Sequence, residues 1–229
     1  MELSAIVPLP NSGADTAAAA FTPVAGEALL VRIVRMMLGA VPEDRIVVAA
    51  AEPFVGDSRE VLASTGLSSV AVAVAIGSGA RAHCLTAGLQ YLGAKQVSHV
   101  LIHDIRRPLA STALRDRVIA QLRHGSAIVV PALAVTDSVK AVDAHGSVTG
   151  TLDRSTLRAV QYPRGFAADQ LVELLARRTS DEFDELEDAI RAGVPIAVVE
   201  GDPEAFVAEL PRDARFVEAI IAGRRPNSD

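Results

Sequence analysis

Four polar segments of the chain carry the residue types that bind phosphate groups. Three of them contain an arginine within three residues of a glycine or an aspartate, namely Arg81, Arg107 and Arg154. A guanidinium can bind phosphate through two parallel hydrogen bonds, and transfer at a triphosphate also needs backbone N–H groups around it. The segments are GSGARAHC (77–84), HDIRRP (103–108), AVTDSVK (134–140) and TLDRSTLRAVQYPR (151–164).

The other reactive side chains have simpler interpretations. The five histidines lack metal-ligand spacing, and we assign no residue to a metal. Cys84 lies on an apolar helix face and is expected in the core, because no lysine or histidine is placed to activate its thiol. The acidic run 181–188 is expected to be a solvated helix face, with Mg²⁺ binding there as the alternative.

Each phosphate-binding candidate has a structural alternative as well. Asp104 and Arg107 either contact a ligand or cap the turn after a strand. Arg154 either binds a ligand or, with Asp153, fixes the base of a projecting hairpin. Lys140 is either a ligand or a charge on the surface of that hairpin.

Short β-branched runs alternate with amphipathic segments along the chain. The runs predict strands, and the segments predict helices that connect them. Such alternation predicts an α/β fold, with a doubly wound, mostly parallel sheet whose ligands bind beyond the carboxyl ends of the strands. Predicted strands are 3–7, 45–50, 70–74, 99–103, 127–130 and 195–199; predicted helices are 29–38, 58–63, 81–92, 113–122, 167–178, 181–192 and 214–222.

Residues 138–152 interrupt this rhythm. Their alternating character and the turn signal at residues 143–146 predict a β-hairpin with little apolar content of its own. An isolated hairpin is marginal in water, so the arm needs a partner, and a second copy of the chain is the simplest one. We therefore expect a single domain over residues 1–229, an inserted β-arm at 137–156, and a homodimer formed through the arm.

Composition narrows the class of protein. The 229 residues are 50% hydrophobic and only 3% aromatic, and 22 basic against 28 acidic residues give a net charge of −6. This balance argues against nucleic-acid binding, which gains affinity from clustered cations and stacking aromatics. A single cysteine, the absence of a signal-peptide pattern and apolar runs well below the roughly 20 residues of a membrane span predict a cytoplasmic protein without membrane contact.

Together, the four segments resemble the 2-C-methyl-D-erythritol 4-phosphate cytidylyltransferases of isoprenoid-precursor synthesis. That family has G-G-x-E-R-x-x-S, H-D-A-A-R-P, P-V-x-D-T-x-K and T-V-D-R-x-x-L-W-x-x-Q-T-P-Q in the same order. The likeness continues through residues 183–206 and so covers nearly the whole chain. It implies a Rossmann-like nucleotidyltransferase fold, a dimer with exchanged arms, and transfer of CMP from CTP to a sugar-alcohol phosphate, with Mg²⁺ as the cofactor of an active enzyme.

The resemblance also implies roles for individual residues. The nucleotide-binding positions are Gly77, Gly79, Arg81 and Cys84, the last standing where the family has serine. The substrate-binding positions are Asp104, Arg107, Ser138, Arg154 and Tyr162. Arg106 and Arg164 are cations that the family pattern lacks, and either is a further candidate for holding a phosphate.

The first loop departs from the family pattern. The family reads A-A-G-x-G-x-R-M and then P-K-Q, whereas Asp15 stands here at the arginine position and Ala19 at the lysine position. A later lysine position is occupied by Val207. A unit charge about 5 Å from a phosphate is worth roughly 3 kcal/mol at an effective dielectric near 20. No basic residue precedes Arg32, so we assign no catalytic residue and expect the family reaction to be weak or lost.

Two alternatives remain open at this stage. In the first, the chain is a non-catalytic phosphate-binding or regulatory dimer, that is, a pseudoenzyme, which could pair with an active relative. In the second, it is a nucleotidyltransferase for a different nucleotide or polyol phosphate. Arg106, Tyr162 and Arg164 suggest the last alternative, because they change the polar groups around the acceptor.

Overall fold

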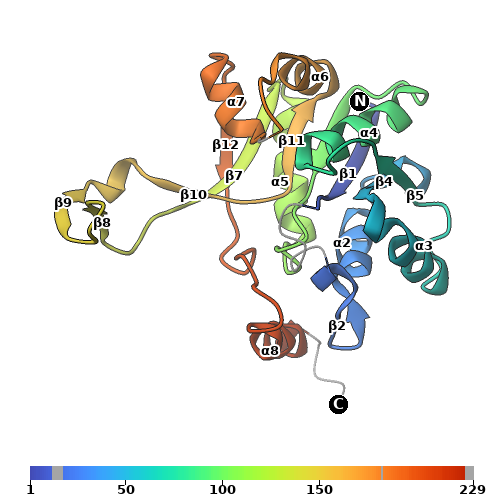
Figure 1. Ribbon diagram of the computed structural model, residues 1–229, viewed down its shortest axis with the longest axis horizontal. Helices are drawn as coiled ribbons and strands as arrows, with labels where there is room; N and C mark the ends of the chain where they lie inside the picture. The colour runs from blue at the N-terminus through green and yellow to red at the C-terminus, as the bar shows by residue number, and fades with distance from the viewer. Residues whose placement is uncertain (12–17, 182, 225–229) are drawn as a thin grey trace.

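A mixed, mostly parallel sheet flanked by helices forms the body of the protein (Figure 1). The computed structural model describes residues 1–11, 18–181 and 183–224. Within these residues the sheet order is β10-β7-β11-β6-β1-β4-β5, and β12 pairs with the same strand, β7. The β1–β4, β1–β6, β4–β5 and β7–β12 pairs are parallel. The predicted fold class is confirmed.

The central strands are apolar on both faces, as expected for parallel strands covered by helices on each side. β1 (Leu3–Leu9) and β4 (Ile46–Ala51) are buried along their whole length. Along β1, side chains alternate between two cores: Val7 packs on one side of the sheet and Ile6 on the other. The other predicted strands are confirmed as β5 (Ala71–Ala75), β6 (His99–Ile102), β7 (Ile128–Ala134) and β12 (Ala197–Glu200).

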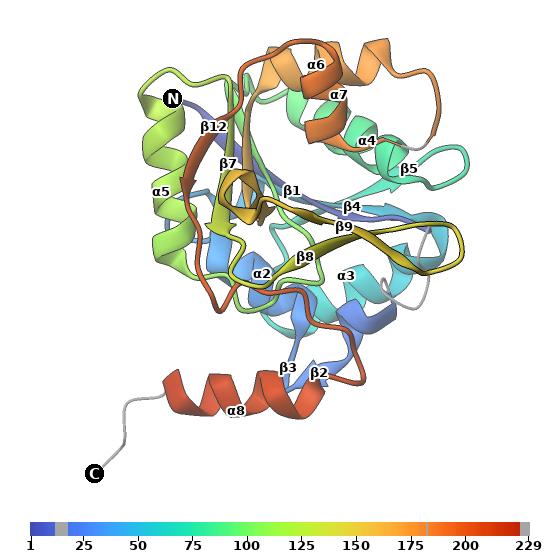
Figure 2. The same ribbon diagram turned by 90° about the vertical axis from the view of Figure 1, so that its left-hand side faces the viewer.

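Helices cover both faces of the sheet (Figure 2). One core is closed by α2 (Leu29–Met37), α3 (Val55–Ser64), α5 (Thr112–Arg123) and α8 (Ala214–Arg224). The other is closed by α4 (Arg81–Gly93), α6 (Ala168–Arg177) and α7 (Glu185–Arg191). The short elements are β2 (Pro23–Val24), β3 (Glu27–Ala28), and the 3-10 turns η1 (Ala19–Phe21), η2 (Glu43–Arg45), η3 (Glu52–Phe54) and η4 (Arg154–Thr156). No helix within the described residues is long and apolar enough to cross a membrane.

Two antiparallel strands of the main sheet were not predicted. β10 (Arg158–Val160) pairs with β7, and β11 (Arg164–Ala167) lies between β6 and β7. Both are three or four residues long, too short for a periodic pattern to stand out. Because β11 runs antiparallel to β6, it brings Arg164 opposite Ile102, the last residue of β6.

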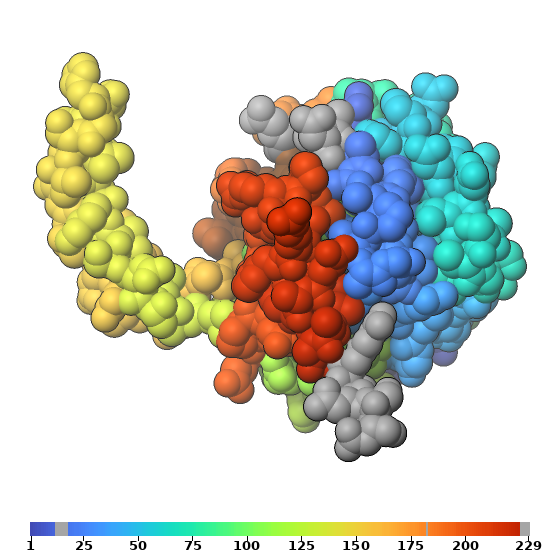
Figure 3. Space-filling model, turned by 90° about the horizontal axis from the view of Figure 1, so that it is seen from below, coloured from blue at the N-terminus to red at the C-terminus, as the bar shows by residue number. Residues whose placement is uncertain are grey.

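The predicted arm is present as the hairpin β8 (Val139–Val142) and β9 (Val148–Leu152). Its turn is closed by a hydrogen bond from the Asp143 amide to the Ser147 carbonyl, 3.0 Å long. The arm projects from the body and stands clear of it in the space-filling view (Figure 3). Val142, Val148 and Leu152 are exposed on it.

The packing of α4 on β1 predicts opposite effects for two glycines of the same helix. A Cβ at Gly88 would lie 2.9 Å from two carbons of the buried Ile6, whereas a Cβ at Gly93 would meet nothing within 4 Å. Gly88→Ala is therefore expected to lower the free energy of unfolding by about 1–3 kcal/mol. Gly93→Ala is expected to raise it by roughly 0.5–1 kcal/mol, because alanine favours the helix. Urea denaturation measures both, and stabilisation by both variants would contradict the packing.

Candidate active site

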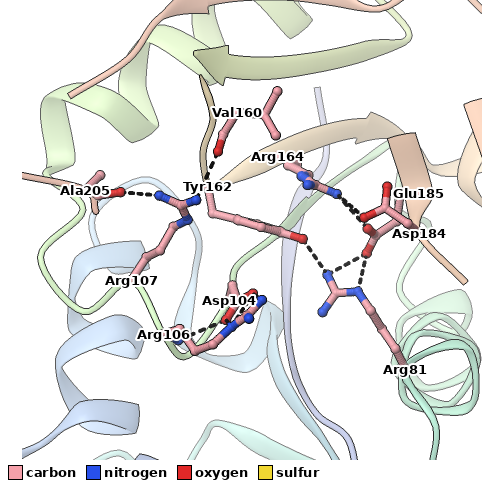
Figure 4. A network of polar contacts seen from close by, with 10 residues as sticks. All are labelled: Arg81, Asp104, Arg106, Arg107, Val160, Tyr162, Arg164, Asp184, Glu185 and Ala205. Carbon is pink, nitrogen blue, oxygen red and sulfur yellow. Dashed lines mark hydrogen bonds and ion pairs between the residues drawn. The ribbon is translucent and has the colours of Figure 1, made fainter. Parts of the chain in front are cut away.

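Polar side chains from three parts of the chain meet beyond the end of β6 (Figure 4). Asp104, Arg106 and Arg107 belong to the loop that follows this strand. Tyr162 lies two residues before β11, which starts beside the end of β6. Arg81 is the first residue of α4. The structure thus brings together four of the predicted site residues, Arg81, Asp104, Arg107 and Tyr162, at the edge of the sheet where the fold class places ligands.

A buried carboxylate joins two of these segments. Glu185, at the start of α7, is fully buried. Its Oε1 accepts a hydrogen bond of 2.8 Å from Arg81 Nε, and its Oε2 accepts one of 2.9 Å from Arg164 Nη1. Asp184 lies 3.4 Å from the same Arg164 nitrogen and also caps α7 through its other oxygen. The prediction that residues 181–188 form a solvated helix face is wrong for Glu185, because two arginines hold its charge inside the protein.

Tyr162 lies between the two arginines that Glu185 holds. The guanidinium carbon of Arg164 is 4.2 Å from the centre of the Tyr162 ring, and that of Arg81 is 5.6 Å from it. Arg81 Nη2 also donates a hydrogen bond of 3.1 Å to the Tyr162 hydroxyl. Burial, together with the charge of Glu185, raises the pKa of Tyr162 despite these cations. Tyr162 is therefore a neutral phenol that spaces two arginines, stabilised by cation–π contacts.

Asp104 is paired with Arg106, a residue that the family pattern lacks. Arg106 Nε donates to Asp104 Oδ1 at 3.0 Å, and Arg106 Nη2 donates to Oδ2 at 2.6 Å. The backbone amide of Arg106 donates to Oδ1 as well. Burial alone would raise the pKa of Asp104, but the hydrogen bonds and charge of Arg106 lower it to about 2. The Arg107 amide donates to the Asp104 carbonyl at 3.0 Å, so both residues belong to the turn after β6 as the structural alternative expected, but the side-chain partner of Asp104 is Arg106.

Arg107 and His103 close the back of this loop. The guanidinium of Arg107 donates to the carbonyls of Ala205 and Val160, the latter at 3.0 Å. Because carbonyls carry no net charge, the positive charge of Arg107 is not cancelled by these bonds. His103 is fully buried, and burial lowers its pKa to about 4. The neutral ring donates from Nε2 to the Arg107 carbonyl at 3.0 Å.

Two glycines let the segment 77–80 approach the first loop. Gly77 and Gly79 both have positive φ values, +103° and +70°, which favour glycine. A Cβ on Gly79 would lie 2.8 Å from the Cβ of Ala51, and the Gly79 carbonyl accepts a hydrogen bond of 2.8 Å from the Asn11 amide. Cys84 is buried below Gly79, and burial raises its thiol pKa to about 11. The core interpretation of Cys84 is confirmed.

The arm residues lie apart from this cluster. Ser138 is exposed near the base of the arm, and Arg154 donates a hydrogen bond to the Thr136 carbonyl. Lys140 donates across the hairpin to Thr151 Oγ1 at 2.7 Å. Within one chain, Arg154 therefore contacts the base of the hairpin and Lys140 lies on the hairpin surface, as the structural alternatives expected. Asp15 lies outside the described residues, Ala19 lies in η1, and Val207 is exposed.

Sequence reasoning missed Glu185 and left Arg106 and Arg164 without partners. The sequence offered one signal only, since Arg81 was expected at a ligand-binding strand end, where a partly buried cation needs a carboxylate nearby. Within the described residues, no three His, Cys, Asp or Glu side chains are grouped to hold a metal ion. Among the described residues, three carboxylates, those of Asp104, Asp184 and Glu185, bind the cluster of Arg81, Arg106 and Arg164, and Arg107 lies beside it. Guanidinium groups in such a cluster can bind an anion.

The comparisons with known proteins agree on one family. A family model described as 2-C-methyl-D-erythritol 4-phosphate cytidylyltransferase matches residues 5–223. The chain is 38% identical over 226 residues to the 2-C-methyl-D-erythritol 4-phosphate cytidylyltransferase of Nocardia farcinica, covering 96% of this chain and 94% of that one. It is 34% identical over 220 residues to the protein of that name from Rhodococcus opacus, covering 95% and 94%.

Solved structures agree at the level of the fold. The crystal structure of 2-C-methyl-D-erythritol 4-phosphate cytidylyltransferase from Thermus thermophilus matches with a TM-score of 0.73 at 27% identity, covering 97% of this chain and all of that one, 100%. The structure of 4-diphosphocytidyl-2C-methyl-D-erythritol synthase from Anaerococcus prevotii matches with a TM-score of 0.76 at 23% identity, covering 96% and 98%.

The buried position of Glu185 predicts a large effect of its charge on stability. Glu185→Gln leaves two inward-facing arginines without their shared carboxylate and is expected to lower the free energy of unfolding by about 3 kcal/mol. Glu187→Gln, on the same helix, is the matched control: its side chain is 75% exposed and lies 3.8 Å from Arg191, so the expected change is below about 0.5 kcal/mol. Equal effects in urea denaturation would show that Glu185 does not hold the site together.

His103 predicts a dependence of stability on pH. Its pKa is lowered from 6.5 to about 4 in the folded protein, so its contribution is complete above pH 6.5 and is lost as the pH falls toward 4. Over that interval the wild type should lose about 3 kcal/mol relative to a His103→Gln variant. The exposed His124 provides the control variant, His124→Gln, which should follow the wild type. Parallel stability curves for the wild type and His103→Gln would contradict a neutral, buried His103.

Proposed function

Since the chain belongs to the 2-C-methyl-D-erythritol 4-phosphate cytidylyltransferase family of isoprenoid-precursor synthesis, we propose that it transfers CMP from CTP to a sugar-alcohol phosphate at a reduced rate. The observation that supports this proposal is that Arg81, Arg106 and Arg107 lie around Tyr162 beyond the end of β6, with Arg106 held by Asp104. Such a cluster suits two phosphate-bearing substrates that must be brought together, because positioning and charge are most of what this chemistry requires.

The reaction is a displacement at the α-phosphorus of CTP. A phosphate oxygen of the acceptor forms a bond to this phosphorus, the bond to the β-phosphate oxygen breaks, and pyrophosphate leaves with its electron pair. Negative charge builds up on the leaving group, so cations on the wall of the pocket lower the barrier. Arg107 suits this role, because its hydrogen bonds go to carbonyls and leave its charge available. Asp104, ionised at neutral pH, suits an acceptor hydroxyl.

We propose Mg²⁺ as the cofactor of this reaction, where it would neutralise part of the triphosphate charge. Among the described residues no group of three potential ligands is present, and both oxygens of Asp104 are engaged by Arg106. Mg²⁺ is commonly held by one or two carboxylates together with substrate phosphates. Here the phosphate oxygens would supply most of its ligands, with Asp104 as the nearest carboxylate of the anion-binding cluster.

The reduced rate follows from the substitutions at the expected cation positions. Ala19 and Val207 are apolar, and Asp15 brings a negative charge. Each missing cation removes roughly 3 kcal/mol of interaction with a phosphate at about 5 Å, and each 1.36 kcal/mol of barrier is about tenfold in rate. Partial compensation by other residues keeps the reaction measurable.

We propose that the active form is a homodimer joined through the arm. The hairpin β8–β9 stands clear of its own body and exposes Val142, Val148 and Leu152, an apolar set that a second copy would cover (Figure 3). Ser138 directly precedes β8 and Arg154 begins η4 after β9, and the arm stands away from the body of the same chain in Figure 1. In a dimer these two residues would serve the site of the partner subunit.

A cytoplasmic location is part of the same proposal. Cys84 is the only cysteine of the sequence and is buried with a raised pKa, so it is suited to a reducing compartment. Fractionation of cells that express the full-length chain tests this location directly.

The functional prediction is that restoring one cation raises the rate. Wild type with CTP, Mg²⁺ and 2-C-methyl-D-erythritol 4-phosphate should release pyrophosphate slowly, and Ala19→Lys should raise kcat/KM for CTP by about tenfold. Ala18→Lys adds the same charge at the exposed neighbouring position and serves as the matched control, with a smaller expected effect.

Calorimetry separates the rival functions. Binding of the sugar phosphate without any pyrophosphate release from wild type or Ala19→Lys would support the non-catalytic dimer and contradict the transferase. Turnover with another nucleoside triphosphate or polyol phosphate in place of these substrates would contradict the specificity proposed here.

A further inference from the structure

The loop that carries Arg106 lies beside Ala19, where an expected cation is missing, and contacts Ala208, the neighbour of Val207. A cavity of about 90 Å³ lies between them and is lined by Ala19, Leu29, Ile105, Arg106, Ala208, Glu209 and Leu210. The Ala208 amide donates a hydrogen bond of 2.8 Å to the Arg106 carbonyl, which holds the segment after Val207 against this loop. A residue at position 106 therefore lies beside both Ala19 and the neighbour of Val207.

The guanidinium of Arg106 is held in one orientation, but not all of its N–H groups are engaged in hydrogen bonds. Its Nε and Nη2 donate to Asp104, and its side chain remains 50% exposed. Nη1 has no hydrogen-bond partner among the described residues. A guanidinium bound along one edge by a carboxylate keeps N–H groups on its other edge, in the fixed fork that suits phosphate.

Arg107 is the cation of this cluster whose charge is least offset. The hydrogen bonds and charge of Asp104 raise the pKa of Arg106, and the nearby Arg81 opposes this effect only in part. Arg107 is disfavoured by Arg106 and Arg164, and burial together with these neighbours lowers its pKa. The Asp104 charge is largely matched by Arg106, so Arg107 has no carboxylate of its own to offset it. A polyphosphate bound beside Arg106 and Arg107 would relieve this repulsion.

We propose that Arg106 supplies, from the neighbouring loop, the triphosphate-binding cation that is missing at Ala19 and Val207. This inference rests on the proposed function, since it names the residue that keeps the reduced transfer reaction measurable. It also assigns a role to an arginine that stands where the family pattern has alanine. The ligand is the triphosphate of CTP rather than the acceptor phosphate, because the cavity beside Arg106 adjoins the first loop.

A double-mutant cycle tests the replacement. Arg106→Ala should lower kcat/KM for CTP by roughly 30- to 100-fold, a larger change than any rise in the KM of the sugar phosphate through the loss of the partner of Asp104. Adding Ala19→Lys to Arg106→Ala should restore at least about thirtyfold, a larger gain than the rise of about tenfold in the wild type, because the two cations serve one ligand. Equal gains in the two backgrounds would overturn the replacement.

Controls separate the role of Arg106 from folding. Arg177→Ala is matched in type, since Arg177 is exposed and paired with Glu173, and it should leave kcat/KM unchanged. Arg106→Lys retains a cation for the buried Asp104 and should fold with intermediate activity. A loss of folded protein in Arg106→Ala that Ala19→Lys does not repair, together with wild-type activity in Arg106→Lys, would contradict the proposal.

Binding of inorganic tripolyphosphate distinguishes this inference from the proposed function. Calorimetry should show at least roughly tenfold weaker binding to Arg106→Ala than to wild type, whether or not either protein turns over CTP. Weaker binding without any turnover would keep the inference and refute the transferase. Turnover with unchanged binding and unchanged kcat/KM in Arg106→Ala would refute the inference alone. If tripolyphosphate does not bind to the wild type, the inference is refuted, because the proposed ligand group is not recognised.

Discussion

The arrangement of the site depends on the carboxylate of Glu185, which is fully buried and can stay charged there only because Arg81 and Arg164 each bind one of its oxygens. An unpaired charge in the interior costs several kcal/mol, so the three side chains must move and fold as one unit. The unit joins the start of α4, the start of β11 and the start of α7. It fixes the position of Tyr162, and with it one wall of the site.

The same pairing divides the arginines into two groups. Arg81 and Arg164 are matched by Glu185 and Asp184 and serve mainly to shape the pocket. Arg106 and Arg107 lie on the other side of Tyr162, where one is oriented by Asp104 and the other only by carbonyls (Figure 4). The net charge of −6 says nothing of this division. Positive charge is scarce in the first loop, and it is concentrated instead in the loop that follows β6.

The sequence allowed the scaffold to be predicted better than the partners within it. β1 and β4 are runs of buried apolar residues, and the arm follows from its turn at residues 143–146, because these are local signals. The pairing of Glu185 with Arg81 joins residues 104 positions apart, and no local pattern reports such a contact. β11 was not predicted for a related reason. Its four residues form a strand because they pair with β6 and β7, and these contacts leave no local pattern in the sequence. The charge deficit at Ala19 was visible in the sequence, but its neighbour Arg106 was visible only in the fold.

We place the cation set for the triphosphate in the loop after β6 and include Arg106 in it. A crystal structure of the full-length protein with CTP and Mg²⁺ would test this placement. We expect a guanidinium nitrogen of Arg106 within about 3 Å of a phosphate oxygen of the triphosphate. A bound triphosphate that lies beyond about 6 Å from Arg106 and is held by other cations would contradict it.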